Sequence, residues 1–238
     1  MPYGYYGFYW EPTYVLVLIG AVISLLASAG VRSAFSKYSR VASRTRMTGA
    51  EAARRLLQSQ GICDVTVEPV SGNLTDHYDP RTRTLRLSDT VYAESSVAAI
   101  GVAAHECGHA IQDASGYAPL RLRSAFVPVA NLGSKACWIL ILVGVLIGGS
   151  RSSFLIQMGI WCFAAVVIFQ IITLPVEFNA SGRALRLLGD QGILYDEEVD
   201  MTKKVLSAAA LTYVAGVAAS LLQLLRLILL FGGRRGRD

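Results

Sequence analysis

Two histidines and a glutamate in this chain stand at a spacing that suits metal chemistry. His105 and His109 are four residues apart, so on an α-helix both imidazoles lie on one face and can reach the same ion. Glu106 follows the first histidine, and in an H-E-x-x-H helix this carboxylate serves as a general base toward water on a catalytic zinc. The alternative is a helix with two structural histidines around an ion-paired glutamate.

The residues around this motif predict the helix that it needs. Apolar residues recur at helical spacing over residues 94–113, and serines near the start can cap the helix. Few charges lie there outside the motif, so we expect a buried helix in which an ionised Glu106 needs a cationic partner. Cys107 is expected to be a small buried residue on the back of this helix rather than a ligand.

The composition is that of a membrane protein. Apolar residues make up 53% of the 238 residues, and the mean hydropathy is +0.44. Four apolar segments are each long enough to cross about 30 Å of hydrocarbon, although one or two of them could instead be helices buried in protein. The segments cover residues 14–31, 127–149, 154–176 and 205–231.

The charges around the first apolar segment predict an orientation. The ten N-terminal residues are rich in aromatic side chains and contain no lysine or arginine, whereas basic residues cluster at 32–46. We therefore expect the N-terminus outside and the following domain in the cytoplasm. With four spans, the basic tail at residues 234–237 would also lie outside, against the same rule. Arg226 within the last segment favours the alternative that this segment does not cross.

The soluble part lies between the first two apolar segments and holds about 95 residues, enough for one small domain. Thr48 and Glu51 form a capping-box pattern before a helix over residues 50–60. Alternating apolar residues predict short strands at 64–70 and 82–88. In metallopeptidases a sheet edge beside the metal helix holds extended substrate by main-chain pairing, and we expect the same here.

Charge and cysteine content disfavour several other classes. The net charge of +5 comes from basic residues that suit an anionic membrane leaflet, and no nucleic-acid-binding motif is present. The four cysteines lack C-x-x-C spacing, which argues against a disulfide framework or a zinc ribbon and fits a reducing compartment. A transport protein would need charged residues inside its spans, and the four apolar segments contain no acid.

A catalytic zinc needs a third protein ligand and one open position. Glu177 follows Pro175 at the end of the third apolar segment, where a lone acid is costly and often functional. The alternative is an interfacial glutamate that stabilises the start of a helix. The residues by themselves leave the choice of third ligand open. The other candidates are His77, Asp76, Asp79 and Asp113.

The H-E-x-x-H motif and the downstream Glu177 resemble those of the membrane-bound gluzincins of the HtpX and CAAX-prenyl-protease group, which pair H-E-x-x-H with E-x-x-A-D. The chain is more closely similar to the YugP-type family of bacterial neutral zinc metallopeptidases, over residues 37–213. This resemblance implies that Glu177 is the third zinc ligand. Ser181 stands where the wider group has an aspartate that orients the ligands. The stretches that carry the resemblance are residues 74–80, 103–106, 116–121 and 174–180.

The resemblance implies a membrane-bound zinc-dependent endopeptidase. Zinc would be held by His105, His109 and Glu177 with water in the fourth position, while Glu106 acts as general base and then protonates the leaving nitrogen. His77 is a candidate donor to the oxyanion, its alternative being a structural role in a polar turn, and Tyr78 and Tyr213 are further candidates.

The expected partners are a lipid bilayer and protein substrates, namely membrane or unfolded proteins cleaved near the cytoplasmic face, with no nucleic acid; the oligomeric state is not predicted. The alternative function is a zinc-binding membrane scaffold or regulator without peptidase activity.

The fold class expected is a mainly α membrane protein with a small α+β gluzincin-like zinc peptidase domain and about four transmembrane helices. The expected regions are the aromatic segment and first span (1–31), the peptidase domain (32–125), a transmembrane hairpin (126–176), a helix with the third ligand (177–204), and a hydrophobic helix with a basic tail (205–238).

Overall fold

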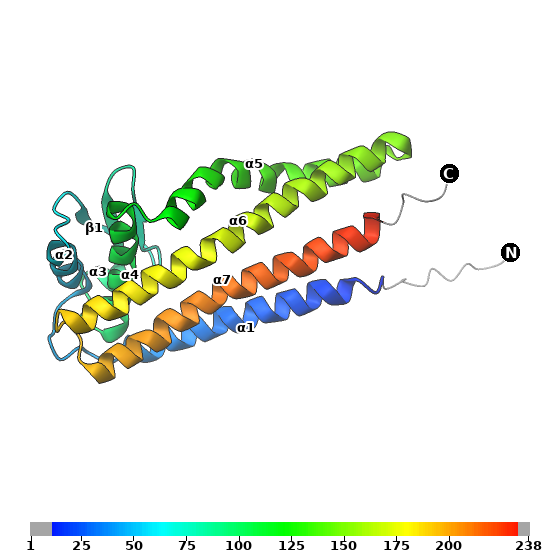
Figure 1. The fold of residues 1–238 in the computed structure, drawn as a ribbon. Coiled ribbons are helices and arrows are strands. Elements are labelled where there is room, and N and C mark those ends of the chain that lie inside the picture. The colour runs from blue at the N-terminus through cyan, green and yellow to red at the C-terminus, as the bar shows by residue number, and fades with distance from the viewer. Residues whose placement is uncertain (1–10, 233–238) are drawn as a thin grey trace. The chain divides into compact units, whose positions relative to one another are not determined.

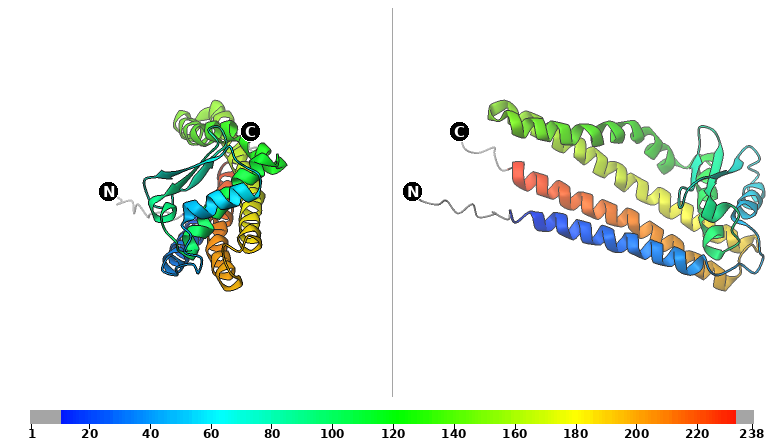
Figure 2. Two further views of the ribbon diagram at one scale, coloured as in Figure 1. Left: turned by 90° about the vertical axis from the view of Figure 1, so that its left-hand side faces the viewer. Right: turned by 180° about the vertical axis from the view of Figure 1, so that it is seen from behind.

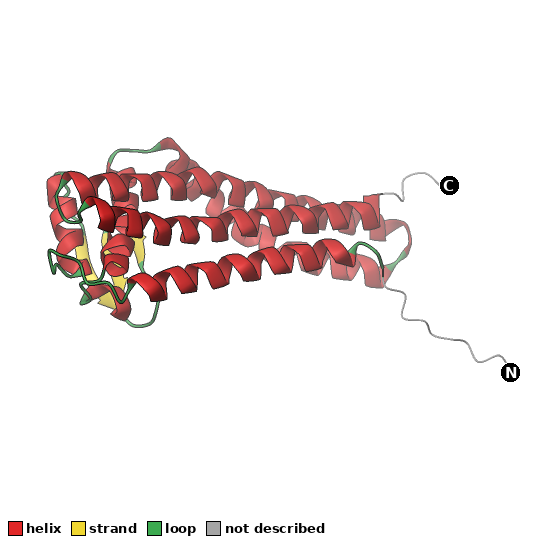
Figure 3. Ribbon diagram, turned by 90° about the horizontal axis from the view of Figure 1, so that it is seen from below, coloured by secondary structure: helices red, strands yellow, loops and turns green. Residues whose placement is uncertain are grey.

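The structure is a computed structural model that describes residues 11–232, and the side chains of residues 149–151 within that range are not described. It is mostly helical, with one small sheet (Figures 1 and 3). The N-terminal aromatic residues and the basic tail, on which part of the predicted orientation rests, lie outside the described residues. Among the described residues, four helices are long and apolar enough to cross a membrane, as the sequence predicts: α1 (Tyr14–Tyr38), α5 (Ala118–Ile147), α6 (Gly149–Asp190) and α7 (Asp196–Phe231).

The long helices extend beyond the apolar segments that the sequence marks. Helix α6 has 42 residues, which at 1.5 Å per residue is about 63 Å, roughly twice the thickness of the hydrocarbon layer. It continues through Pro175 and Glu177 without a break, so the third apolar segment and the helix expected after it are one element. The four-residue spacing of Ala180, Ala184 and Leu188 predicts that these side chains share one inward face of the helix, and all three are buried.

The chain divides into two compact units, and the first contains the described residues up to 25 together with 129–167 and those from 215 onward. Helices α5 and α6 approach closely there, because a Cβ added to Gly159 would lie 2.8 Å from the Cys137 carbonyl oxygen. In the same unit Arg226 of α7 lies 3.7 Å from a carboxylate oxygen of Glu11, and its guanidinium stands 4.2 Å from the Tyr14 ring centroid. The arginine in the last apolar helix therefore has an acidic partner.

The second unit comprises residues 26–128 and 168–214 and contains all of the sheet. Strand β3 (Thr84–Ser88) lies in the middle, with β1 (Thr66–Val70) parallel to it and β2 (His77–Asp79) antiparallel. Leu85 and Leu87 of β3 are fully buried. The two predicted strands are confirmed, whereas the segment interpreted as a polar turn contains the edge strand β2.

Three further helices complete the second unit: α2 (Gly49–Ser59), α3 (Asp89–Tyr92) and α4 (Val97–Ala114) (Figure 2). The predicted capping box is present at the start of α2, where Thr48 and Glu51 exchange hydrogen bonds. The Ser96 hydroxyl caps α4 by accepting from the Ala99 amide at 3.1 Å, also as predicted. The core joins α2, β3, α4 and α6 and leaves α4 largely buried.

Small residues let α4 lie close to its neighbours in this unit. A Cβ added to Gly108 would lie 2.5 Å from the Ala180 carbonyl oxygen of α6, and one added to Gly101 would lie 2.6 Å from the Thr202 methyl group of α7. The backbones of α4 and α6 therefore meet at Gly108, one residue before the second histidine of the motif.

We predict that Gly108→Ala destabilises the protein by about 1–3 kcal/mol, because the added methyl group cannot fit without separating α4 from α6. Thermal unfolding in detergent measures this. Gly182→Ala is the matched control, since a Cβ there meets nothing within 4 Å. An unfolding temperature of Gly108→Ala equal to the wild type would contradict the close approach.

Candidate metal centre

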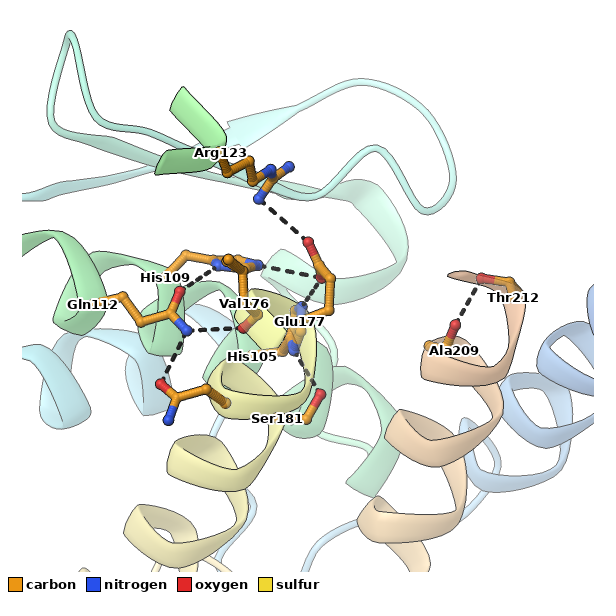
Figure 4. A network of polar contacts seen from close by, with 10 residues as sticks. His105, His109, Gln112, Arg123, Val176, Glu177, Ser181, Ala209 and Thr212 are labelled. Carbon is orange, nitrogen blue, oxygen red and sulfur yellow. Dashed lines mark hydrogen bonds and ion pairs between the residues drawn. The ribbon is translucent and has the colours of Figure 1, made fainter. Parts of the chain in front are cut away.

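Three side chains from α4 and α6 converge on one point in the second unit. The Nε2 atoms of His105 and His109 lie 3.3 Å and 3.6 Å from Oε2 of Glu177 (Figure 4). The ligand atoms of these three residues all lie within 4.8 Å of one another. The two histidines lie on one face of α4 because they are four residues apart. Glu177 comes close to them because α6 crosses α4 at Gly108.

The buried carboxylate of Glu177 shows that this site suits a cation. The residue is only 3% exposed, and Oε2 accepts no hydrogen bond although both imidazoles face it. An ionised carboxylate in such a place is costly unless a positive charge compensates it. Two imidazole nitrogens and a carboxylate oxygen are also the donor set that zinc takes in hydrolytic sites. The residues present therefore fit a zinc ion.

Hydrogen bonds hold His109 in the orientation that zinc needs. Nδ1 of His109 lies 3.0 Å from Oε1 of Gln112, whose amide nitrogen donates to the Val176 carbonyl at 2.8 Å and to Asn179 Oδ1 at 3.0 Å. Because the amide nitrogen of Gln112 is the donor in these two bonds, the atom of Gln112 that faces His109 is its oxygen. This oxygen can only accept, so the proton of the bond is on Nδ1 of His109. The lone pair of His109 is then on Nε2, the atom that faces Glu177 (Figure 4).

His105 is oriented by a hydroxyl group from α6. Its Nδ1 lies 3.1 Å from the Ser181 hydroxyl. Ser181 is four residues after Glu177 on α6, so one turn of helix supplies both a candidate ligand and the group that orients another. A hydroxyl here does what a carboxylate does in many metal sites, which is to fix the imidazole ring.

Electrostatics at the site favour positive charge. Burial lowers the pKa of His109, but the adjacent carboxylate of Glu177 and the negative charge of Glu106 outweigh burial and raise this pKa above its ordinary value. The same negative field acts on any cation placed between the three side chains.

Arg123 belongs to the site, although the sequence gives no sign of this. Its Nη1 donates to Oε1 of Glu177 at 3.3 Å (Figure 4). The arginine holds one carboxylate oxygen and leaves the other toward the histidines. It lies on α5, 54 residues from Glu177 in the chain, and its sequence context marks it only as one more basic residue suited to an anionic membrane leaflet.

Glu106 and two of the candidate ligands, His105 and Glu177, border a cavity of about 200 Å³. The cavity is lined by His105, Glu106, Glu177 and Tyr213 on its polar side. Tyr213 of α7 interacts electrostatically with the carboxylates of Glu106 and Glu177. The remaining walls are mostly apolar and come from α1, α4, α7 and the loop before β2: Val31, Phe35, Leu74, Val102, Val205, Leu206, Ala209 and Ala210.

His77 and Tyr78 are not among the residues that line this cavity. The His77 side chain is exposed, and its Nδ1 lies 2.8 Å from the Thr75 carbonyl oxygen. The Tyr78 hydroxyl donates a hydrogen bond to Asp113 at 2.9 Å. Burial is the main cause, and this hydrogen bond the second, that raises the pKa of Tyr78 well above its ordinary value. Of the three tyrosine and histidine candidates for oxyanion stabilisation, Tyr213 is the one that borders the cavity.

The other acids considered as third ligand have partners elsewhere. Asp113 accepts from Tyr78, and Asp79 accepts from the Arg81 amide at 2.9 Å. Asp76 borders the cavity, but its carboxylate accepts from the amide and hydroxyl of Ser88.

Cys107 is buried, as predicted. Its thiol lies 3.6 Å from the Ala53 carbonyl oxygen of α2. Burial raises the pKa of this thiol, which keeps it protonated and unsuited to bind a metal.

Comparison with known proteins assigns the chain. A family model described as “Putative neutral zinc metallopeptidase” matches residues 13–232. The chain belongs to this family. It is 48% identical over 226 residues, which are 94% of this chain and 98% of the relative, to a protein of Bacillus subtilis (strain 168) named “Putative membrane protease YugP”. No solved structure matches the chain significantly. The family expected from the motifs is thereby confirmed.

We predict that Ser181→Ala weakens zinc binding about 10- to 100-fold, because His105 loses the group that fixes its ring. Competition with a chelator of known affinity measures the dissociation constant. Ser59→Ala on α2 is the control, because the Ser59 hydroxyl donates to the Leu56 carbonyl and accepts from the Gln60 side chain, neither of which belongs to the metal centre. Equal zinc affinity of Ser181→Ala and wild type would show that Ser181 does not position the site.

Proposed function

We propose that this protein is a zinc-dependent endopeptidase that cleaves membrane or unfolded proteins near the cytoplasmic face of the membrane. The observation that carries the proposal is that His105, His109 and Glu177 converge on one point, and that two of them, His105 and Glu177, border the same cavity as Glu106. The name of the B. subtilis relative, a membrane protease, supports it. The gluzincin-like character of the domain is part of the same proposal.

The side chains divide the reaction between them. His105, His109 and Glu177 would hold zinc, which supplies a Lewis acid for the scissile carbonyl and lowers the pKa of water. Glu106 accepts the proton of the attacking water within the cavity and delivers it to the leaving nitrogen. Tyr213 is placed to donate a hydrogen bond to the oxygen that becomes negative, whereas His77 lies in β2 and does not line the cavity.

The shape and lining of the cavity indicate the kind of peptide that it accepts. Its volume of about 200 Å³ exceeds the roughly 150 Å³ of an apolar cavity that binds benzene. Because most of the wall is apolar, we infer that a large apolar side chain beside the scissile bond enters it. Strand β2 lies at an edge of the sheet, and α4 packs against it, so an extended substrate can pair there.

The proposed membrane arrangement has four spans with the N-terminus outside and the second unit in the cytoplasm. Helix α6 is long enough to cross the bilayer and still carry Glu177 beyond it. The ion pair between Arg226 and Glu11 removes one objection to a crossing by α7, because the arginine is no longer a lone charge in an apolar helix. In this arrangement the basic cluster after the first span stays in the cytoplasm and determines the orientation, although it leaves the basic tail outside.

We predict that Glu106→Gln retains zinc and lowers cleavage at least 100-fold, because the carboxylate that moves the proton is lost. The measurement is cleavage of a fluorescent unfolded protein by the detergent-purified chain, with the zinc content determined on the same sample. Glu94→Gln, at an exposed position before α4, is the control. Zinc binding without cleavage by the wild type would favour the scaffold function, and normal cleavage by Glu106→Gln would disprove the mechanism.

We predict that Ala210→Leu changes substrate choice rather than abolishing activity. Ala210 is 8% exposed and borders the cavity, so a larger side chain there takes the space of the substrate group. Cleavage beside phenylalanine should fall at least tenfold relative to cleavage beside alanine in otherwise identical peptides. An unchanged ratio would mean that this cavity does not receive the substrate side chain.

A further inference from the structure

A second pocket in the same unit shares no residue with the cavity at Glu106. Its volume is about 480 Å³. It lies where the end of α2 and the C-terminal half of α4 meet the part of α6 that follows Glu177. The residues that line it are Gln60, Ile111, Phe178, Asn179, Gly182, Arg183, Arg186 and Leu187.

The charged side chains of this pocket are two arginines from one face of α6. Arg183 uses Nε to donate to Asn179 at 2.8 Å, and its guanidinium lies 5.8 Å from the Tyr117 ring centroid. Within residues 11–232 neither Arg183 nor Arg186 forms a salt bridge with an acid. Two guanidinium groups without acidic partners at the wall of a polar pocket make a site for an anion, and their planar forks suit phosphate.

The position of this pocket along α6 points to the membrane surface as the source of that anion. It begins at Phe178, two residues after the third apolar segment ends. Arg183 and Arg186 lie about 10 Å and 15 Å beyond that end at 1.5 Å per residue, within reach of lipid headgroups for long side chains. Phe178 is 50% exposed, as is usual for an aromatic residue at the membrane interface.

We propose that this pocket binds the phosphate of an anionic phospholipid headgroup through Arg183 and Arg186. Basic pockets beside transmembrane helices on the cytoplasmic side are suited to such headgroups. This proposal depends on the membrane placement and not on peptidase activity.

A chain of hydrogen bonds joins the pocket to the metal centre. Arg183 donates to Asn179 Oδ1 at 2.8 Å, Gln112 donates to the same oxygen at 3.0 Å, and His109 Nδ1 lies 3.0 Å from Gln112 Oε1. Gln112 is fully buried, so it cannot exchange these partners for water. A headgroup that fixes Arg183 therefore also fixes Asn179 and Gln112, and through them the His109 ring.

The coupling is reciprocal. If the headgroup tightens zinc binding by some factor, zinc must tighten headgroup binding by the same factor. A bilayer-bound protein would then hold zinc more tightly than one outside the membrane. In this scheme Asn179 and Gln112 are positioning residues.

The first experiment measures lipid binding by calorimetry on the full chain in nonionic detergent, with and without zinc. Short-chain phosphatidylglycerol should bind at one saturable site, and short-chain phosphatidylcholine at least tenfold more weakly. Equal binding of the two lipids would overturn the proposal. Inorganic phosphate that binds as tightly as phosphatidylglycerol would assign the pocket to a soluble phosphate compound and overturn the lipid assignment.

Variants test whether these arginines form the site. Arg186→Gln should weaken phosphatidylglycerol binding at least tenfold, and Gly182→Glu should do the same by placing a carboxylate where a side chain meets open space. Arg81→Gln, at an exposed arginine that does not line the pocket, removes the same charge and should change binding less than twofold. Equal losses in Arg81→Gln and Arg186→Gln would show general charge attraction instead of a site. Thermal unfolding verifies that each variant is folded.

The coupling has its own readout. With saturating phosphatidylglycerol the wild type should bind zinc at least fivefold more tightly, and Asn179→Leu should remove this difference. Lipid binding without any change in zinc affinity would disprove the coupling. Failure to bind zinc at all would instead refute the metal centre, and the lipid measurement on the zinc-free chain would still decide the pocket.

Discussion

The metal centre depends on one constraint, which is that a buried carboxylate must meet two imidazole nitrogens at a single point. Glu177 has one oxygen held by Arg123 and the other without a hydrogen bond. Removing such a carboxylate from water costs several kcal/mol that only a nearby positive charge offsets. The close contact of α4 and α6 follows from this requirement, and Gly108 is the residue that permits it. A larger residue at that position would move Glu177 away from both histidines.

The polar residues behind the two histidines make the site rigid. Gln112 and Ser181 each engage a Nδ1 atom, which leaves both Nε2 atoms toward Glu177. Because Ser181 and Asn179 lie on the same stretch of α6 as Glu177, a shift of this helix would disturb all of these contacts together. The continuity of α6 through Pro175 matters for the same reason, since it ties the geometry of the site to a helix long enough to enter the membrane.

The sequence predicted features whose signals are local. The capping box at Thr48, the cap at Ser96 and the i, i+4 histidines are each contained within a few residues, and the structure has all three. The buried face of α6 at Ala180 and Ala184 followed from helical spacing in the same way.

Features that depend on the tertiary fold were missed. Arg123 contacts Glu177 across 54 residues and Ser181 contacts His105 across 76, and no periodicity encodes such pairs. Strand β2 was missed because its three residues hold a histidine and an aspartate, whose strand conformation comes from pairing with β3. The choice of Glu177 over the other candidates likewise needed the family resemblance, because the residues alone favoured Glu177 by its position at the end of an apolar segment but left the choice open.

X-ray absorption spectroscopy at the zinc edge of the purified, zinc-loaded chain tests the central claim most directly, because it reports the ligand atoms themselves. The account predicts a shell of nitrogen and oxygen atoms at about 2.0–2.1 Å, with the outer-shell signature of two imidazoles and no sulfur. The spectrum of Glu177→Ala should lose a light-atom ligand and keep both imidazoles. A sulfur shell near 2.3 Å, or the signature of a single imidazole, would contradict the assignment of His105, His109 and Glu177 as the ligands.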